Sequence, residues 1–157
     1  HGCHLRAGSR VERSILFEYT RLGEFQTFSA RMDSLPLATG FVQAFCEQQR
    51  VAPESALRLT LIVEELFTNA IQHGHGGDND APVRIQVGVD AAQLLLCFED
   101  SAPPFDPLQY LKHSAPDPDM ERDRPGGWGL HLVAQMSERF DYVHAEGWNR
   151  LQLALRL

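Results

Sequence analysis

Cysteine, lysine and long apolar runs are all scarce in this sequence, and each shortage excludes a class of protein. The three cysteines, Cys3, Cys46 and Cys97, are scattered without a C-x-x-C pair. This pattern argues against a disulfide framework and against a zinc site, and it fits a reducing cytoplasm. No stretch approaches the roughly 18 apolar residues of a membrane-spanning helix, and no signal-peptide pattern opens the chain. We therefore expect a cytoplasmic protein without a membrane partner.

Positive charge is also in short supply. The 157 residues include 14 lysines and arginines against 21 aspartates and glutamates, which gives a formal net charge of −7 at pH 7, and Lys112 is the only lysine. Proteins that bind nucleic acid usually carry a basic stripe, so we expect no direct contact with DNA or RNA. A nucleotide remains a suitable ligand for an acidic protein, because backbone amides and a metal ion can hold its phosphates.

The sequence does have regular hydrophobic periodicity, and its 43% hydrophobic residues suffice for one domain with a core. Alternation predicts five strands, at about residues 24–32, 83–89, 94–98, 140–145 and 151–157. Helical spacing predicts three helices, the first capped by Ser34, over about 34–50, 53–74 and 126–139. The proline-rich residues from about 106 to 125 are predicted to form a lid without a helix. This order predicts helices on one face of a sheet, after a linker or N-terminal extension at 1–22.

One edge of the second predicted helix carries three polar side chains. Glu65, Asn69 and His73 are spaced i, i+4 and i+8, so they lie on one face beside an apolar stripe that includes Leu66 and Phe67. A carboxylate can take a proton from an attacking hydroxyl, and an amide oxygen one turn later can bind a hard cation such as Mg²⁺. The same pattern is also typical of a solvated helix edge, and the helix alone does not decide between the two.

Two further motifs follow along the chain. Asp100 stands at the end of a predicted strand, where its carboxylate can accept a hydrogen bond from an exocyclic amine such as that of adenine; an aspartate that merely starts a turn is the alternative. Residues 126–129, Gly-Gly-Trp-Gly, open the last predicted helix, where free N–H groups favour phosphate. A tight turn would use the same glycines, and neither a Walker loop nor a dinucleotide fingerprint is matched.

In series these motifs are much more specific than any one of them. The helix with E-x-x-x-N-A-I-x-H-G, the strand that ends in Asp100, the lid and the G-G-x-G-L helix start resemble the GHKL ATPase and kinase superfamily. Within it, the chain is most similar to the bacterial anti-sigma-factor serine/threonine kinases of the RsbW and SpoIIAB type, over about residues 25–157. The resemblance implies a GHKL-type ATP-binding kinase domain over 23–157. It implies a two-layer α/β sandwich, the Bergerat fold, with a mixed, mostly antiparallel sheet, and ATP and Mg²⁺ as cofactors.

The resemblance also implies roles for residues at matching positions. Glu65 is expected to be the general base, Asn69 the Mg²⁺ ligand that bridges the metal to the ATP phosphates, and His73 a supporting residue on the phosphate side. Asp100 is expected to read the adenine amino group. The residues expected around the phosphates share the glycine motif and its flanks: Arg124 (with Arg122 as the alternative register), Gly126, Gly127, Gly129 and Leu130.

The chain departs from the family pattern at one position. The family's D-x-G after the strand is Asp100-Ser101-Ala102 here, so a methyl group replaces a hydrogen that faces the base. Alanine tolerates most backbone conformations except those with positive φ. Ala102 therefore counts among the expected nucleotide contacts, and the change either loosens adenine binding or leaves it intact.

The function implied by the resemblance is that of a Mg-ATP-dependent serine/threonine protein kinase and anti-sigma factor in partner switching. Its partners would be an anti-anti-sigma protein of the STAS type, which it phosphorylates, and a sigma factor, and a homodimer stays open. Two alternatives also stay open: a non-catalytic, nucleotide-gated module that sequesters a regulatory partner, and a histidine-kinase-type catalytic domain. The chain begins with His1 rather than Met, so we expect a processed product or a piece of a larger regulator.

Overall fold

The computed structural model describes residues 22–114 and 127–157. Their strands form a sheet in the order β1-β2-β3-β5-β4. These strands are β1 (Leu22–Ser29), β2 (Pro82–Asp90), β3 (Gln93–Asp100), β4 (Arg139–Ala145) and β5 (Trp148–Arg156). Every neighbouring pair is antiparallel, whereas the resemblance implied a mixed, mostly antiparallel sheet.

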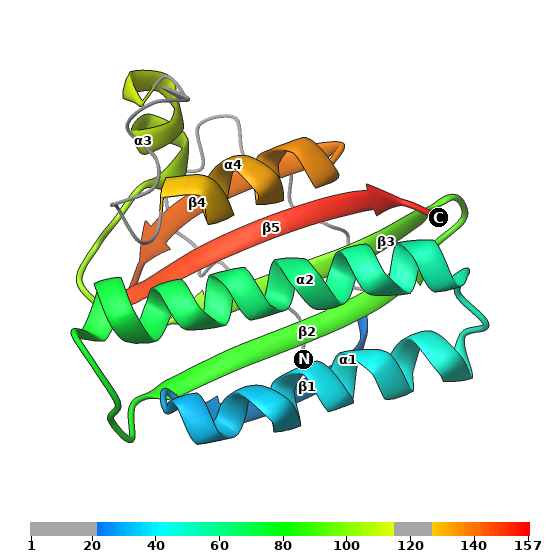
Figure 1. The fold of residues 1–157 in the computed structure, drawn as a ribbon, viewed down its shortest axis with the longest axis horizontal. Helices are drawn as coiled ribbons and strands as arrows, with labels where there is room; N and C mark the ends of the chain where they lie inside the picture. The colour runs from blue at the N-terminus through cyan, green and yellow to red at the C-terminus, as the bar shows by residue number, and fades with distance from the viewer. Residues whose placement is uncertain (1–21, 115–126) are drawn as a thin grey trace.

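The helices lie on one face of this sheet. They are α1 (Leu35–Gln48), α2 (Pro53–Asn69), α3 (Pro107–His113) and α4 (Gly127–Met136). Figure 1 shows α1, α2 and α4 side by side over the sheet, with α3 at one end. This arrangement is the predicted two-layer α/β sandwich. Within the described residues, every helix is too short or too polar to cross a bilayer.

Local sequence explains where the two long helices begin and end. Both α1 and α2 have a proline in the first turn, where the missing N–H has no helical partner to lose. A π-helical turn, η3 (Ala70–His75), continues α2 and ends at Gly76, whose φ of 73° is the left-handed conformation common after helices. The expected cap at Ser34 is wrong: this residue has helical backbone angles at the end of a 3₁₀ turn, η2 (Met32–Ser34), and its side chain makes no capping bond.

The core fills the space between the helices and the sheet. Alternate residues of β2 and β3 point to the helices and are fully buried, which confirms the two predicted strands: Val83, Ile85, Val87, Leu94, Leu96 and Phe98. They meet the apolar stripe of α2, where Phe67 packs edge-on between Phe28 and Phe98 with ring centroids 6.3 and 6.5 Å apart. The stripe faces inward, so the opposite edge of α2 is left for polar side chains.

The prediction of a lid without a helix is wrong for its first part. Pro107 begins α3, and the side chain of Asp106 accepts hydrogen bonds from the backbone N–H groups of Leu108 (2.9 Å) and Gln109 (3.2 Å). A proline at the first helical position costs no hydrogen bond, and an aspartate just before it is a strong N-cap. The rest of the predicted lid, residues 115–126, lies outside the described residues.

The turn between β4 and β5 is shorter than the sequence suggested. Glu146 and Gly147 have φ values of 56° and 81°, so two residues with positive φ reverse the chain. As a result β5 begins at Trp148, three residues before the predicted strand. Asn149 is therefore part of the sheet, directly opposite Asp100 in the β3–β5 register.

The cysteines correct one expectation from the sequence. Cys97, which is buried on β3, is disulfide-bonded, whereas Cys46 is buried and free. Separation along the chain argued against a disulfide framework, but it does not fix the distance between two residues in the fold. Cys97 lies on the sheet face opposite the helices, as does the buried ion pair of Glu99 with Arg150.

Candidate nucleotide site

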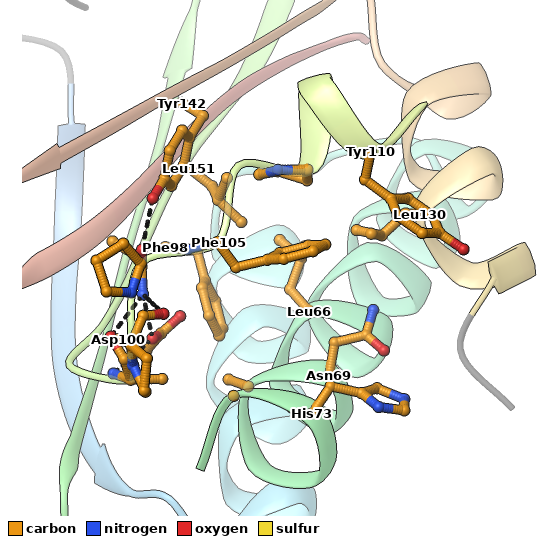
Figure 2. A pocket seen from close by; sticks show the side chains of 17 residues that line it. Leu66, Asn69, His73, Phe98, Asp100, Phe105, Tyr110, Leu130, Tyr142 and Leu151 are labelled. Atoms are coloured by element: carbon orange, nitrogen blue, oxygen red, sulfur yellow. Dashed lines mark hydrogen bonds between the residues drawn. The ribbon is translucent and has the colours of Figure 1, made fainter. Parts of the chain in front are cut away.

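A cavity of about 550 Å³ lies at one end of the molecule, between the helices and the sheet. Its walls are mostly apolar, and the larger side chains among them come from six different elements or connections: Leu66, Phe98, Phe105, Tyr110, Leu130 and Leu151. Figure 2 shows the polar groups in two places, with Asn69 and His73 on the helix side and Asp100 with Tyr142 on the sheet side. An apolar cavity of this size with a few polar groups is typical of a small-molecule site.

The helix side of the cavity is formed by the last turn of α2 and by η3. Asn69 and His73 both line the cavity, as their i, i+4 spacing predicts. The side-chain nitrogen of Asn69 is buried and has no hydrogen-bond partner among residues 22–114 and 127–157. A buried polar atom without a partner costs about 1–3 kcal/mol, so such atoms in folded proteins call for an explanation. The explanation that fits this position is a ligand with an acceptor atom, such as a phosphate oxygen, to which the N–H group would donate.

On the sheet side, Asp100 ends β3 at the cavity wall with only 7% of its surface exposed. Its Oδ1 accepts hydrogen bonds from the backbone N–H of Ala102 (2.9 Å) and from Nδ2 of Asn149 (3.0 Å). No hydrogen bond from the described residues reaches its Oδ2. A carboxylate oxygen is thus left as an acceptor at the end of an apolar cavity.

The side chain of Asn149 makes more hydrogen bonds among the described residues than that of any site residue predicted from the sequence. Its Nδ2 also donates to the carbonyl oxygens of Ala102 (2.9 Å) and Pro103 (3.3 Å). Its Oδ1 accepts from the hydroxyl of Tyr142 (2.7 Å) and from the backbone N–H of Phe105 (3.3 Å). One amide therefore ties β4 and the 102–105 segment to the end of β3.

The phenol of Tyr142 keeps its proton in this setting. Burial raises the pKa of Tyr142 above its ordinary value, and the negative charges of Asp106 and Asp100 raise it further, while a hydrogen bond with the backbone of Phe105 opposes the rise. A protonated phenol is the form that can donate to Asn149.

The predicted general base and the glycine motif meet at the start of α4. A Cβ at Gly129 would lie 2.1 Å from Oε2 of Glu65, so the carboxylate lies directly against the glycine. Gly127 is the first residue of α4, and Leu130, one residue after Gly129, lines the cavity. Two motifs that are more than 60 residues apart in the sequence (Glu65 and Gly129) are thus in contact.

The departure from the family pattern is matched by a glycine directly beside it. Ala102 and Gly74 both line the cavity, and a Cβ at Gly74 would lie 2.8 Å from the Cβ of Ala102. Real Cβ atoms are not found this close together, so the methyl group of Ala102 fits only because residue 74 has no side chain. Arg124 and Gly126, also predicted for this site, lie outside the described residues, as does Arg122.

Sequence reasoning missed Asn149 and Tyr142. Tyr142 falls within the strand predicted at 140–145 and Asn149 between the last two predicted strands, and nothing in their local sequence marks them as site residues. The sheet order is the signal that would find them, because β5 pairs not only with β4, the strand before it in the sequence, but also with β3, which ends in Asp100.

The residues present fit ATP with Mg²⁺. The unpaired amide of Asn69 can turn to offer its oxygen to a cation, and Mg²⁺ commonly takes one or two protein oxygens together with phosphate oxygens. The free carboxylate oxygen of Asp100 can accept from an amino group on a base. The cavity volume suits a ligand of this size.

The fold is an α/β domain with a cavity large enough for a small ligand between its two layers. The chain belongs to the family of histidine kinase-like ATPase domains, whose model matches residues 28–155. This match confirms the resemblance to the GHKL superfamily. No match is found among curated protein sequences.

Solved structures share the fold at low sequence identity. One is the SiaB–SiaC complex from Pseudomonas aeruginosa, at 12% identity and a TM-score of 0.65, with 86% of this chain and 90% of that chain covered. Another is the catalytic domain of the histidine kinase ThkA, at 13% identity and a TM-score of 0.50, with 85% of this chain and 96% of that chain covered. At these identities the similarity shows the fold alone.

Proposed function

We propose that this domain binds Mg-ATP in the cavity and transfers the γ-phosphoryl group to a serine or threonine of a partner protein. One observation carries the proposal: Asn69 and His73 of the helix motif, Asp100 at the strand end and Leu130 of the glycine motif, far apart in the sequence, all line one cavity, and Glu65 lies against Gly129 next to Leu130. Membership of an ATPase domain family supports ATP as the ligand.

In this proposal the base of ATP lies at the sheet side and the phosphates at the helix side. Asp100 would accept a hydrogen bond from the amino group of adenine, and the apolar walls would enclose the ring. The phosphates would extend past Asn69 and His73 toward Gly129 at the start of α4, where backbone N–H groups and the helix dipole favour negative charge.

The transfer step would use Glu65 as the base. The hydroxyl oxygen of the partner forms a bond to the γ-phosphorus, the bond to the β–γ bridging oxygen breaks, ADP leaves, and the hydroxyl proton passes to the Glu65 carboxylate. Glu65 lies against Gly129, the residue before the cavity-lining Leu130, and this position supports the role proposed for it. Mg²⁺ held by Asn69 would neutralise charge on the phosphates.

The partner would be an anti-anti-sigma protein of the STAS type, with a sigma factor as the alternative partner, in the cytoplasm. The SiaB–SiaC complex contains a chain of this fold, which supports the proposal that this domain binds a partner protein. Phosphorylation adds a charge of roughly −1.5 to −2 to the partner surface. That charge would weaken the complex by repulsion from this acidic chain, whose formal net charge is −7.

The first test separates binding from transfer. Calorimetric titration of ATP should show binding that Mg²⁺ strengthens, and Asn69→Ala should abolish the effect of Mg²⁺. With radiolabelled ATP and candidate STAS proteins, Glu65→Gln should lower the transfer rate by roughly 10²- to 10⁴-fold while ATP binding persists. Glu64→Gln is the matched control, because Glu64 is exposed on the same helix and should change neither quantity.

Each alternative function has its own outcome in this test. ATP binding without transfer of label to any partner would contradict a kinase and favour the nucleotide-gated module. Product phosphate that is labile in acid would indicate a phosphohistidine and so a histidine-kinase-type domain. Transfer by Glu65→Gln at the wild-type rate would show that Glu65 is not the base.

A further inference from the structure

We propose that Asn149 is the positioning residue of the base site and that it makes the site selective for a base with an amino group. The inference rests on the proposed nucleotide function and adds a residue and a specificity to it. Asn149 is opposite Asp100 in the β3–β5 register and is only 5% exposed. It is the described residue whose side chain joins Asp100 to β4 and to the 102–105 segment.

The chemistry of its neighbours fixes which way the Asn149 amide points. A backbone N–H can only donate, so the atom that faces the N–H of Phe105 must be the amide oxygen. The amide nitrogen then faces Oδ1 of Asp100 and the carbonyl oxygens of Ala102 and Pro103, all of which can only accept while the carboxylate is ionised. The hydroxyl of Tyr142 donates to the same amide oxygen at 2.7 Å and so holds this orientation.

This orientation decides what the site offers to a ligand. Oδ1 of Asp100 is occupied by the N–H of Ala102 and by Nδ2 of Asn149, which leaves Oδ2 as the acceptor for a ligand. An ionised carboxylate has no proton to donate, so a base with a carbonyl at that position would bring two acceptors together. A site with a buried polar group of this kind rejects an analogue without the complementary group strongly, because the buried group is then left unpaired. Asn149, by holding Oδ1 of Asp100, thus positions Oδ2 as the group that would select a 6-aminopurine.

The experiment compares two nucleotides that differ in one amino group. ATP and purine riboside 5′-triphosphate, which lacks the 6-amino group, are titrated by calorimetry into the wild-type chain and into variants. The wild type should bind ATP more tightly than the analogue by roughly tenfold or more, as expected for a hydrogen bond to a charged group. Asn149→Ala should reduce this preference to within about threefold, mainly by weakening ATP binding.

Two further variants separate positioning from folding. Tyr142→Phe removes only the hydroxyl that orients Asn149, so it should lower the ATP preference partway and keep the fold even where Asn149→Ala does not fold. Gln43→Ala removes an exposed side-chain amide on α1 and should leave both affinities unchanged. If Asn149→Ala and Tyr142→Phe lose the same affinity for both nucleotides, Asn149 has a merely structural role and the inference is overturned. An unchanged preference for ATP in both variants would also overturn it. Failure of the wild type to bind either nucleotide would instead overturn the proposed function on which the inference rests.

Discussion

At the scale of single residues, the contact between Gly74 and Ala102 explains how this chain tolerates its departure from the family pattern. Both residues line the cavity and lie next to each other, Gly74 in η3 and Ala102 just after β3. A methyl group at position 102 uses the space that a side chain at position 74 would need. The pair therefore behaves as one packing unit, and the cavity wall beside Asp100 keeps its shape.

A double-mutant cycle tests this pair. Gly74→Ala should lower the free energy of unfolding by roughly 1–3 kcal/mol, because its Cβ would meet that of Ala102 at 2.8 Å. Ala102→Gly alone should cost less, and the double variant should recover most of the loss, giving a coupling of about 1 kcal/mol or more in urea unfolding. Gly40→Ala is the control: no atom lies within 4 Å of its Cβ position in α1, so it should stabilise by about 0.5–1 kcal/mol. Additive effects at 74 and 102 would contradict the packing unit.

At the scale of elements, α3 is the helix that the sequence did not predict. Its seven residues follow two prolines and an aspartate, and its proline is in the first turn rather than in the interior. The helix matters for the site because Tyr110 packs against Phe105 with ring centroids 5.9 Å apart, and both line the cavity. A short helix of this kind depends strongly on its N-cap, since few of its backbone groups have partners within the helix.

Removal of the N-cap should therefore loosen α3. Asp106→Ala leaves the N–H groups of Leu108 and Gln109 without their acceptor, and should cost about 1 kcal/mol of local stability. Hydrogen exchange of these two amides should become severalfold faster. Asp106→Asn keeps a capping oxygen and should exchange nearly as the wild type does. Unchanged exchange in Asp106→Ala would show that packing, rather than the cap, holds this helix.

The elements that the sequence predicted well have a regular hydrophobic period. In β2 and β3 the alternation of apolar residues matches the residues that are buried, and in α2 the i, i+3, i+4 spacing does the same. The sequence failed where a cap or a turn outweighed composition, as at Asp106 before α3 and at Glu146-Gly147 before β5. Composition alone predicts such local hydrogen bonds and φ values only weakly.

At the scale of the whole molecule, the sheet order creates the site. Because β5 lies between β3 and β4, the chain that leaves β3 at Asp100 returns through α4 and β4 and then pairs with β3 again. Asp100 and the glycine motif could be predicted from the sequence because each is a local pattern. Asn149 and Tyr142 could not, because their place beside Asp100 depends on pairing between strands about 50 residues apart (Asp100 and Asn149).

The stability of the whole molecule should also depend on alkaline pH, because a thiol is buried in its core. Cys46 is on α1 with only 2% of its surface exposed, and burial raises the pKa of its thiol from 9.0 to about 11. The folded chain therefore keeps the thiol proton over a range where the unfolded chain loses it. This contribution to stability is complete below pH 9 and is lost as the pH rises toward 11, with a slope of up to about 1.4 kcal/mol per pH unit.

Urea unfolding from pH 8 to 10.5 measures this loss, and Cys46→Val should remove part of it. Valine has no proton to lose, so its free energy of unfolding should fall less steeply above pH 9 than that of the wild type. Tyr142 acts in the same direction, because burial also raises its pKa, and Tyr142→Phe should remove a further part at the upper end of the range. If Cys46→Val and the wild type lose the same stability over this range, the thiol does not stay protonated in the folded chain, and α1 must open to solvent before the molecule unfolds.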